Sequence, residues 1–167
     1  MTVIVRGAEA ADAPAINAIY NPYILESVAT FETEPYSDES RVRWLGALAA
    51  DPRHPVFVAQ AGASALAGFA NAAPFDARQA YETSVKVSVF VAPDHHGKGV
   101  AGALYETLFQ ALQVEDVHRA YALIVSPNAA SAVLHQRFGF AHVATLNAVG
   151  RKFGRFHDVM WFEKKLS

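Results

Sequence analysis

Residues 85–112 constrain the fold more than any other stretch, because their hydrophobic period changes once over a short distance. Valine occupies every second position from 85 to 91, and this period of two predicts a β-strand. Pro93 ends the strand, since proline has no N–H to donate to a sheet. After Gly97-Lys98-Gly99 the apolar residues recur at every fourth position, which predicts a helix along Val100, Leu104, Leu108 and Leu112. A strand therefore leads through a glycine turn directly into a helix.

The turn between this strand and helix predicts a phosphate-binding site. Its backbone N–H groups would point in one direction, and the helix dipole adds positive potential there. The Gly97-x-Gly99 spacing lacks the third glycine of a dinucleotide fingerprint and the Lys-Ser/Thr ending of a nucleoside triphosphate loop. A glycine pair of this kind also occurs in purely structural turns, so the flanking residues have to identify the ligand.

Composition narrows the class of protein. The 167 residues are 52% hydrophobic and 18% charged, so we expect one globular domain over residues 1–167. The net charge of −2 and the scattered Lys and Arg argue against a nucleic-acid partner. The absence of cysteine excludes disulfides and thiolate chemistry, and the seven histidines show no metal-ligand spacing. No apolar run reaches the roughly 20 residues of a membrane span, and the start reads as a strand rather than a signal peptide. We therefore expect a cytoplasmic protein with no membrane partner and no metal.

The order of predicted elements is β-α-α-β-β-β-α-β-α-β-β. Strands are predicted at residues 2–6, 54–60, 66–73, 85–91, 117–125, 140–149 and 158–165, with a hairpin turn at 61–64. Asp12, Ser37 and Asn128 precede helical patterns, and Pro22 is expected to kink or end the first of them. Because strands and helices alternate only in the second half, the fold class is α/β (α+β), a mixed sheet with helices on both faces.

The glycine turn and five further blocks resemble one family. His96-Gly97-Lys98-Gly99-Val100-Ala101 resembles the pyrophosphate loop of GNAT N-acetyltransferases, Arg/Gln-x-x-Gly-x-Gly/Ala, with His96 in the first slot. That departure removes one side chain from phosphate binding and leaves the backbone cradle intact. Five further blocks, spread in the right order over nearly the whole chain, resemble the phosphinothricin and methionine sulfoximine acetyltransferase branch of this family. These blocks are Ile19-Tyr20-Asn21, Phe31-x-Thr33-Glu34-Pro35, Ala77-Arg78-x-Ala80-Tyr81, Pro127-Asn128-x-x-Ser131-x-x-Leu134-His135-x-x-x-Gly139-Phe140 and His157-Asp158-Val159.

This resemblance implies the GNAT acyl-CoA N-acyltransferase fold with a mostly antiparallel sheet. It also implies direct acetyl transfer from acetyl-CoA to a small amino-acid-like amine, such as phosphinothricin, methionine sulfoximine or methionine sulfone, by a homodimer. The backbone at Val89, Phe90 and Val91 is expected to pair with the pantetheine arm of the cofactor. The remaining cofactor contacts are expected from Asn128 and Ser131, with Asn128 equally explained as a helix cap, and from His96, Gly97, Lys98, Gly99, Val100, Ala101 and Gly102.

The predicted catalytic groups are Lys86, His135 and Glu34. Lys86 stands where the family usually has a glutamate base, and a lysine of ordinary pKa (~10.4) is protonated at neutral pH. Burial would lower that pKa; otherwise Lys86 would bind an acceptor carboxylate or extend into solvent. Glu34 and His157 are the alternative bases. His135 occupies the slot where many relatives place a tyrosine near the CoA sulfur, so it is expected to donate or relay a proton, or else to lie on the helix surface.

The acceptor is expected to contact the loop around Arg78, whose planar fork suits a carboxylate or phosphinate; a solvated loop arginine is the alternative. Phe31 would wall the pocket or belong to the core. The full predicted acceptor set is Phe31, Asp76, Ala77, Arg78, Tyr81, Lys86, Val87 and Ser88. The basic cluster Arg151-Lys152-x-x-Arg155 is expected simply to solubilise a hairpin; the alternative is that it attracts an anionic acceptor. Two competing functions are an acyl-CoA-binding module that has lost catalysis, suggested by Lys86, and an acetyltransferase of protein N-termini.

Overall fold

The computed structural model describes residues 3–62 and 65–167. Thr2 of the expected first strand lies outside the described residues, as do Ala63 and Ser64 of the expected 61–64 turn. None of the described helices is long and apolar enough to cross a membrane.

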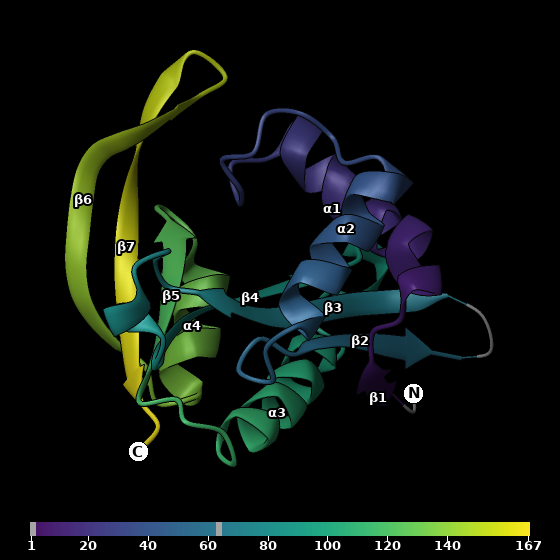
Figure 1. The fold of residues 1–167 in the computed structure, drawn as a ribbon. Helices are drawn as coiled ribbons and strands as arrows, with labels where there is room; N and C mark the ends of the chain where they lie inside the picture. Colours follow the sequence, from purple (N-terminus) through teal and green to yellow (C-terminus); the bar gives the residue numbers. More distant parts are fainter. Residues whose placement is uncertain (1–2, 63–64) are drawn as a thin grey trace.

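A seven-stranded sheet in the order β1-β2-β3-β4-β5-β7-β6 forms the centre of the fold (Figure 1). Neighbouring strands are antiparallel except β4 and β5, which run parallel. The strands are β1 (Val3–Gly7), β2 (Val56–Ala61), β3 (Leu66–Pro74), β4 (Ser84–Val91), β5 (Arg119–Val125), β6 (Ala141–Lys152) and β7 (Arg155–Lys165). The predicted fold class, a mixed and mostly antiparallel sheet with helices on both faces, is confirmed.

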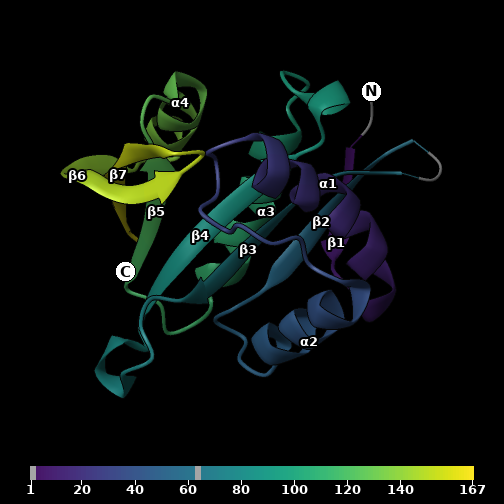
Figure 2. The ribbon, with the colours of Figure 1, turned by 90° about the horizontal axis from the view of Figure 1, so that it is seen from above.

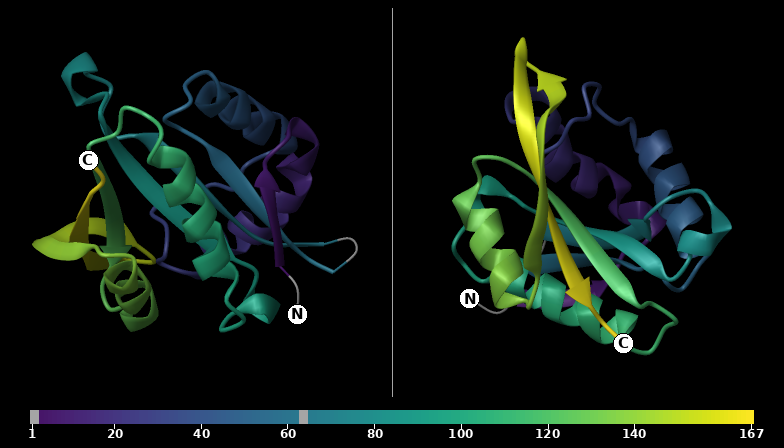
Figure 3. Two further views of the ribbon diagram at one scale, coloured as in Figure 1. Left: turned by 90° about the horizontal axis from the view of Figure 1, so that it is seen from below. Right: turned by 90° about the vertical axis from the view of Figure 1, so that its left-hand side faces the viewer.

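The helices divide between the faces of the sheet. Helices α1 (Ala13–Glu26) and α2 (Asp38–Ala49) cover one face, whereas α3 (Val100–Leu112) crosses the other, with α4 (Ala129–Arg137) beside β5 (Figures 1 and 3). Each face has its own buried cluster. The α3 cluster contains the predicted apolar series Val100, Leu104, Leu108 and Leu112, each at most 1% exposed. The α1–α2 cluster includes Ile16, Ile19, Leu45, Val58 and Phe69.

Local sequence explains where the helices begin, although it misplaces one end. Ser37 caps α2 by accepting a hydrogen bond from the Ser40 N–H, and Asn128 caps α4 by accepting from the Ser131 N–H. Of the two alternatives predicted at Pro22, the end of the helix is wrong, since α1 continues through Pro22 to Glu26. Asp12 precedes α1 without a side-chain cap, because its carboxylate is held instead by Arg6 at 2.7 Å.

Strands β4 and β5 pair over only three positions, Ser84↔Arg119, Val85↔Ala120 and Lys86↔Tyr121. Beyond them β4 stays with β3 as far as Val91, while β5 stays with β7 as far as Val125. The two strands therefore run apart toward the start of α3 (Figure 2). This divergence opens the sheet at its centre and creates the space in which the site is built.

The β6–β7 hairpin rises beyond the sheet and approaches the loop between α1 and α2 (Figures 1 and 3). The Lys152 ammonium donates to the carbonyls of Ser27 and Thr30 at 2.8 and 2.7 Å. The Phe31 ring packs on the Gly150 backbone, where a Cβ would overlap it. Lys152 is 5% exposed, so the prediction that this basic cluster only solubilises the hairpin is wrong for Lys152. We call this junction the loop–hairpin clasp.

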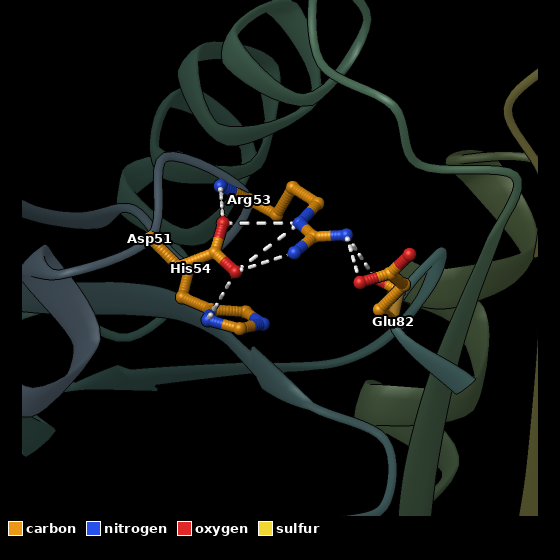
Figure 4. A network of polar contacts seen from close by, with 4 residues as sticks. All are labelled: Asp51, Arg53, His54 and Glu82. Atoms are coloured by element: carbon orange, nitrogen blue, oxygen red, sulfur yellow. Dashed lines mark hydrogen bonds and ion pairs between the residues drawn. The ribbon is translucent and has the colours of Figure 1, made fainter. Parts of the chain in front are cut away.

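A second junction fixes the segment that precedes β4. The Asp51 carboxylate accepts hydrogen bonds from the Arg53 backbone N–H and from the Arg53 guanidinium (Figure 4). The guanidinium also forms an ion pair with the Glu82 carboxylate, and His54 Nδ1 lies 3.9 Å from the Asp51 carboxylate. The Arg53 guanidinium also donates to the Glu82 carbonyl at 3.1 Å. The turn after α2 is thereby tied to the segment that leads into β4.

Candidate functional site

The gap between β4 and β5 contains a cavity of about 870 Å³. Its walls come from the diverging halves of both strands, from the turn and first residues of α3, and from α4. An open position in the middle of a sheet is unusual, because backbone groups there lose their ladder partners. The cavity is therefore bordered by backbone polar groups as well as by apolar side chains.

The backbone of β4 presents hydrogen-bonding groups to this cavity. The Ser84 carbonyl accepts from Phe75 N, and Ala92 N, just after β4, donates to the Ala67 carbonyl. Even-numbered residues of β4 therefore point their backbone groups toward β3. Because these directions alternate along an antiparallel strand, Val87, Val89 and Val91 point their amides and carbonyls into the gap. An extended ligand lying along β4 would therefore find the pattern that a neighbouring strand normally supplies.

At the end of the gap, the start of α3 forms an amide cradle. Gly97 and Gly99 have φ of 72° and 80°, which side-chain-bearing residues rarely adopt. The first intrahelical bond runs from Ala103 N to Gly99 O, so the N–H groups of the preceding first-turn residues point outward. A Cβ at Gly97, Gly99 or Gly102 would meet nothing within 4 Å, which leaves room for a bulky anion. These features fit a diphosphate.

His96 lines the cavity but turns toward the end of β4. Its Nε2 lies 2.9 Å from the Tyr23 hydroxyl and 3.0 Å from the Val91 carbonyl, and the Tyr23 hydroxyl donates to the same carbonyl at 2.6 Å. The imidazole therefore joins α1 to β4. His96 stands where the family motif has arginine or glutamine, so we expected the cradle to rely on backbone amides, and its geometry agrees with this.

His135 is 4% exposed and both of its ring nitrogens are occupied. Nδ1 lies 2.7 Å from the Ser131 carbonyl, to which it donates, and Nε2 accepts from the Tyr105 hydroxyl at 2.9 Å. Burial lowers the pKa of His135, and burial also raises the pKa of Tyr105. The single N–H of a neutral imidazole is here held by the Ser131 carbonyl, and the other ring nitrogen accepts from Tyr105, which argues against the predicted donor role.

A smaller cavity of about 150 Å³ adjoins the larger one on the α1–α2 side of β4. Ser88 and Phe90 line both cavities, so these two residues of β4 lie between the two spaces. The other lining residues of the smaller cavity are polar or aromatic: Tyr20, Glu32, Tyr36, Arg41, Trp44, Phe69 and Asn71. The site thus combines a long cavity that ends at an anion cradle with a small one that contains both signs of charge.

A family model described as acetyltransferase (GNAT) domain matches residues 5–161. The chain belongs to the GNAT acetyltransferase family. It is 46% identical over 165 residues to a phosphinothricin N-acetyltransferase of Streptomyces coelicolor, covering 98% of this chain and 96% of that protein. It is 32% identical over 166 residues to an L-methionine sulfoximine/L-methionine sulfone acetyltransferase of Pseudomonas paraeruginosa, covering 99% and 96%. The predicted family and enzyme class are confirmed.

Solved GNAT structures have the same fold. A GNAT superfamily phosphinothricin acetyltransferase from Sinorhizobium meliloti, in complex with acetyl-CoA, superposes with a TM-score of 0.94 at 30% identity. The match covers 100% of this chain and 90% of that one. The predicted GNAT fold is confirmed over the whole length of the chain.

Most residues predicted to contact the GNAT cofactor line the larger cavity. Lys98 is absent from its lining, whereas the lining does contain Val89, Phe90, Val91, His96, Gly97, Gly99, Val100, Ala101, Gly102, Asn128 and Ser131. Only some of the predicted catalytic and acceptor residues line a cavity. Val87, Ser88 and His135 line the larger cavity, but Glu34, Lys86, Phe31, Asp76, Ala77, Arg78 and Tyr81 line neither.

The predicted acceptor loop is held by its own contacts. The Arg78 guanidinium donates to Asp76 at 2.7 Å and stacks over Tyr81, and its side chain is 73% exposed. Arg78 lowers the pKa of Asp76 to about 2. Lys86 is the last residue of β4 that pairs with β5, and it follows the buried Val85. Its side chain points to the α1–α2 face of the sheet. The half-buried position of Lys86 fits the alternative in which its side chain extends into solvent. The Phe31 ring packs against the β6–β7 hairpin and not against a cavity.

Sequence reasoning missed the polar lining of the smaller cavity. Arg41 follows the α2 cap as an unremarkable helix residue, and Asn71 sits inside an alanine-rich strand. Glu32 lies two positions from Glu34, the residue that the motif singled out. The sequence signal that could have identified Arg41 and Asn71 was a charged or amide side chain within an otherwise apolar helix or strand pattern. The part of the chain that the structure describes contains no cluster of three metal-ligating side chains.

Proposed function

We propose that this GNAT acetyltransferase transfers the acetyl group of acetyl-CoA to the α-amine of a small amino acid of the phosphinothricin, methionine sulfoximine or methionine sulfone type. The observation that carries the proposal is the opening between β4 and β5, which leads from an amide cradle to a small cavity of mixed charge. The relatives named for these acceptors match nearly the whole chain, which supports the same acceptor class.

The donor is held mainly by backbone groups. The first amides of α3, from Val100 to Gly102, bind the diphosphate. The gap-facing carbonyls of Val87 and Val89 and the amide of Val91 pair with the pantetheine arm. When bound, acetyl-CoA supplies an activated thioester. The amide of Val89 faces the gap beside Ser88 and supplies a donor for the oxyanion that develops during transfer.

The acceptor amine approaches from the smaller cavity past Ser88. Glu32 lines that cavity, whereas Glu34 and Lys86 do not, so we assign the removal of the amine proton to Glu32. The amine nitrogen gives its proton to Glu32 and forms the new bond to the acetyl carbon. The carbon–sulfur bond breaks, and the proton held by Glu32 passes through water to the thiolate. Since the chain has no cysteine to carry the acetyl group, transfer is direct.

The test is release of free CoA by the purified protein with acetyl-CoA and L-phosphinothricin, L-methionine sulfoximine or L-methionine sulfone. We expect turnover with at least one of these amines, and at neutral pH about 100-fold less with Glu32→Gln, in the range of general-base contributions. Peptides with free N-termini are the comparison substrates. Faster acetylation of peptides than of any amino acid would contradict the proposal.

Lys86 in place of the family glutamate favours a second candidate, an acyl-CoA-binding module without turnover. Lys86→Glu separates the two functions. A large gain in turnover from near zero would support the binding module. We expect less than a threefold change, because Lys86 lines neither cavity.

We also propose that the protein is a cytoplasmic homodimer. Its location follows from the intracellular acetyl donor. Its assembly is supported by the outer edge of the sheet, where β6 has one neighbour and bears apolar side chains in solvent. Those side chains are Val143, Leu146 and Val149, each 40–56% exposed, with Phe153 and Phe156 at the hairpin tip.

A further inference from the structure

The smaller cavity contains a buried cation with an unused donor. Arg41 is 2% exposed, and its Nε donates to the Asn17 side chain at 2.9 Å. Its Nη2 is buried and has no hydrogen-bond partner among the described residues. A buried guanidinium normally uses its donors on carboxylates or carbonyls, because leaving a charged donor unpaired away from water is costly. The orphaned nitrogen therefore marks a place for an acceptor group.

Aromatic rings surround the Arg41 guanidinium without satisfying that nitrogen. The guanidinium carbon lies 4.3 Å from the ring centre of Tyr36, 4.7 Å from Trp44 and 5.0 Å from Tyr20. Ring faces attract a cation, but they do not replace the in-plane hydrogen bonds of its N–H groups. No carboxylate in the described part of the chain lies within ion-pair distance of Arg41. The cage thus surrounds the cation and leaves its buried Nη2 without a hydrogen-bond partner among the described residues.

The remaining polar groups of the cavity complement this edge. Asn71 is 7% exposed, and its side-chain amide forms no hydrogen bond to a described residue. Glu32 holds the Tyr36 hydroxyl at 3.1 Å and adds a negative charge to the same lining. Ser88 connects the cavity to the thioester side of β4. Positive and negative groups together match a zwitterion.

We propose that Arg41 binds the carboxylate of the amino-acid acceptor, with Glu32 facing its ammonium group. The inference rests on the proposed function and specifies its acceptor site. A carboxylate at the Arg41 edge gives Nη2 its missing partner, and Asn71 supplies a further N–H donor. The amine is then directed past Ser88 toward the acetyl group. Arg78, the arginine singled out by the sequence motif, is already paired with Asp76 and lines neither cavity.

The experiment compares two acceptors that differ only in the carboxylate, L-methionine sulfone and the amine obtained by its decarboxylation. Wild-type protein is expected to prefer the amino acid in kcat/KM, and Arg41→Gln to reduce that preference by about 10- to 100-fold, as expected for a charge-assisted hydrogen bond. Arg41→Lys, which keeps the charge inside the cage, is expected to retain part of the preference. Arg43→Gln on the exposed face of α2 is the matched control and should leave it unchanged.

The two acceptors separate the possible outcomes. If Arg41 only supports the fold, both Arg41 variants lower kcat/KM for the acid and the amine by the same factor, which would overturn the inference while the proposed function stands. Turnover of none of L-phosphinothricin, L-methionine sulfoximine and L-methionine sulfone by the wild-type protein would overturn the proposed function and this inference with it. Melting temperatures of the variants show whether they fold. A selective loss on the acid supports carboxylate recognition.

Discussion

Three basic side chains, Arg41, His135 and Lys152, are each at most 5% exposed, and each is surrounded by segments distant in sequence. His135 joins α3 to α4 through both ring nitrogens, and Lys152 holds two loop carbonyls. Each ring nitrogen of His135 and the ammonium nitrogen of Lys152 therefore has at least one partner within the chain. Arg41 differs, because one of its nitrogens is left without a partner in a lined cavity. At the scale of single residues, this difference is the reason why we propose a ligand-binding role for Arg41 and a structural role for the other two.

Tyr105→Phe tests the structural role of His135. The substitution removes only the hydroxyl that donates to Nε2 and leaves a buried acceptor unpaired, so we expect a loss of about 1–3 kcal/mol in the free energy of unfolding. Urea unfolding measures the loss. Turnover at saturating substrate should change less than threefold. A fall of tenfold or more, or a displaced pH profile, would show that this pair takes part in proton transfer.

At the scale of elements, the site depends on one strand–turn–helix unit that is readable from the sequence. The alternating valines, the two glycines and the four-residue apolar spacing are local signals, and the structure has a strand, a turn with positive φ and a helix at those positions. The cage around Arg41 was not predictable in this way. Its rings come from α1, from the loop after it and from α2, and their meeting depends on the tertiary fold.

Gly99→Ala tests the amide cradle. With φ of 80° at this position, a Cβ introduces about 1–2 kcal/mol of backbone strain, although nothing lies within 4 Å of it. The turn relaxes and its amides lose alignment, so calorimetry should show affinity for acetyl-CoA reduced by about tenfold or more. Gly46→Ala in α2 is the control. It should leave that affinity unchanged and raise stability by about 0.5–1 kcal/mol.

The network around Asp51 predicts how stability depends on pH. Arg53 lowers the pKa of Asp51 to about 2, below its ordinary 3.8. A carboxyl whose pKa is lowered in the folded state stabilises the protein above its ordinary pKa, and this contribution is lost as the pH falls through the lowered value. Asp51→Asn should therefore cost about 1 kcal/mol at pH 7, since the pair is partly solvated, and flatten the fall in stability between about pH 4 and 2.

Urea titrations across this pH range measure the effect of Asp51→Asn. Asp116→Asn, at an exposed position after α3, is the control and should reproduce the wild-type curve. Identical acid dependence in Asp51→Asn and wild type would mean that the network in Figure 4 contributes nothing to folding.

At the scale of the molecule, the sheet separates two hydrophobic clusters, and the gap between β4 and β5 is where the two sides communicate. In the proposed reaction the donor binds mainly on the α3 side and the acceptor on the α1–α2 side. The order of elements predicted this mixed architecture, since strand and helix patterns are strong along the chain. It did not predict how far β6 and β7 rise from the sheet, because bulges at residues 142–144 and 146–150 shape that hairpin.

The exposed apolar side chains of β6 predict where subunits meet. Replacing Leu146 by Glu puts a charge into the proposed contact, so light scattering should show the mass of the dimer give way to that of a single chain. Val114→Lys alters an apolar residue that is 82% exposed outside the hairpin and should leave the mass unchanged. A Leu146→Glu protein that stays dimeric would place the interface elsewhere.

The loop–hairpin clasp has an evolutionary consequence. Glu32 and Tyr36 belong to the same loop that Lys152 and Gly150 restrain through Thr30 and Phe31, so the walls of the acceptor cavity are set partly from the far end of the chain. New acceptors are then reached more readily by paired substitutions, one in the loop and one in the hairpin, than by changes inside the cavity alone. Libraries that vary both segments together should yield altered specificity more often than libraries that vary either one.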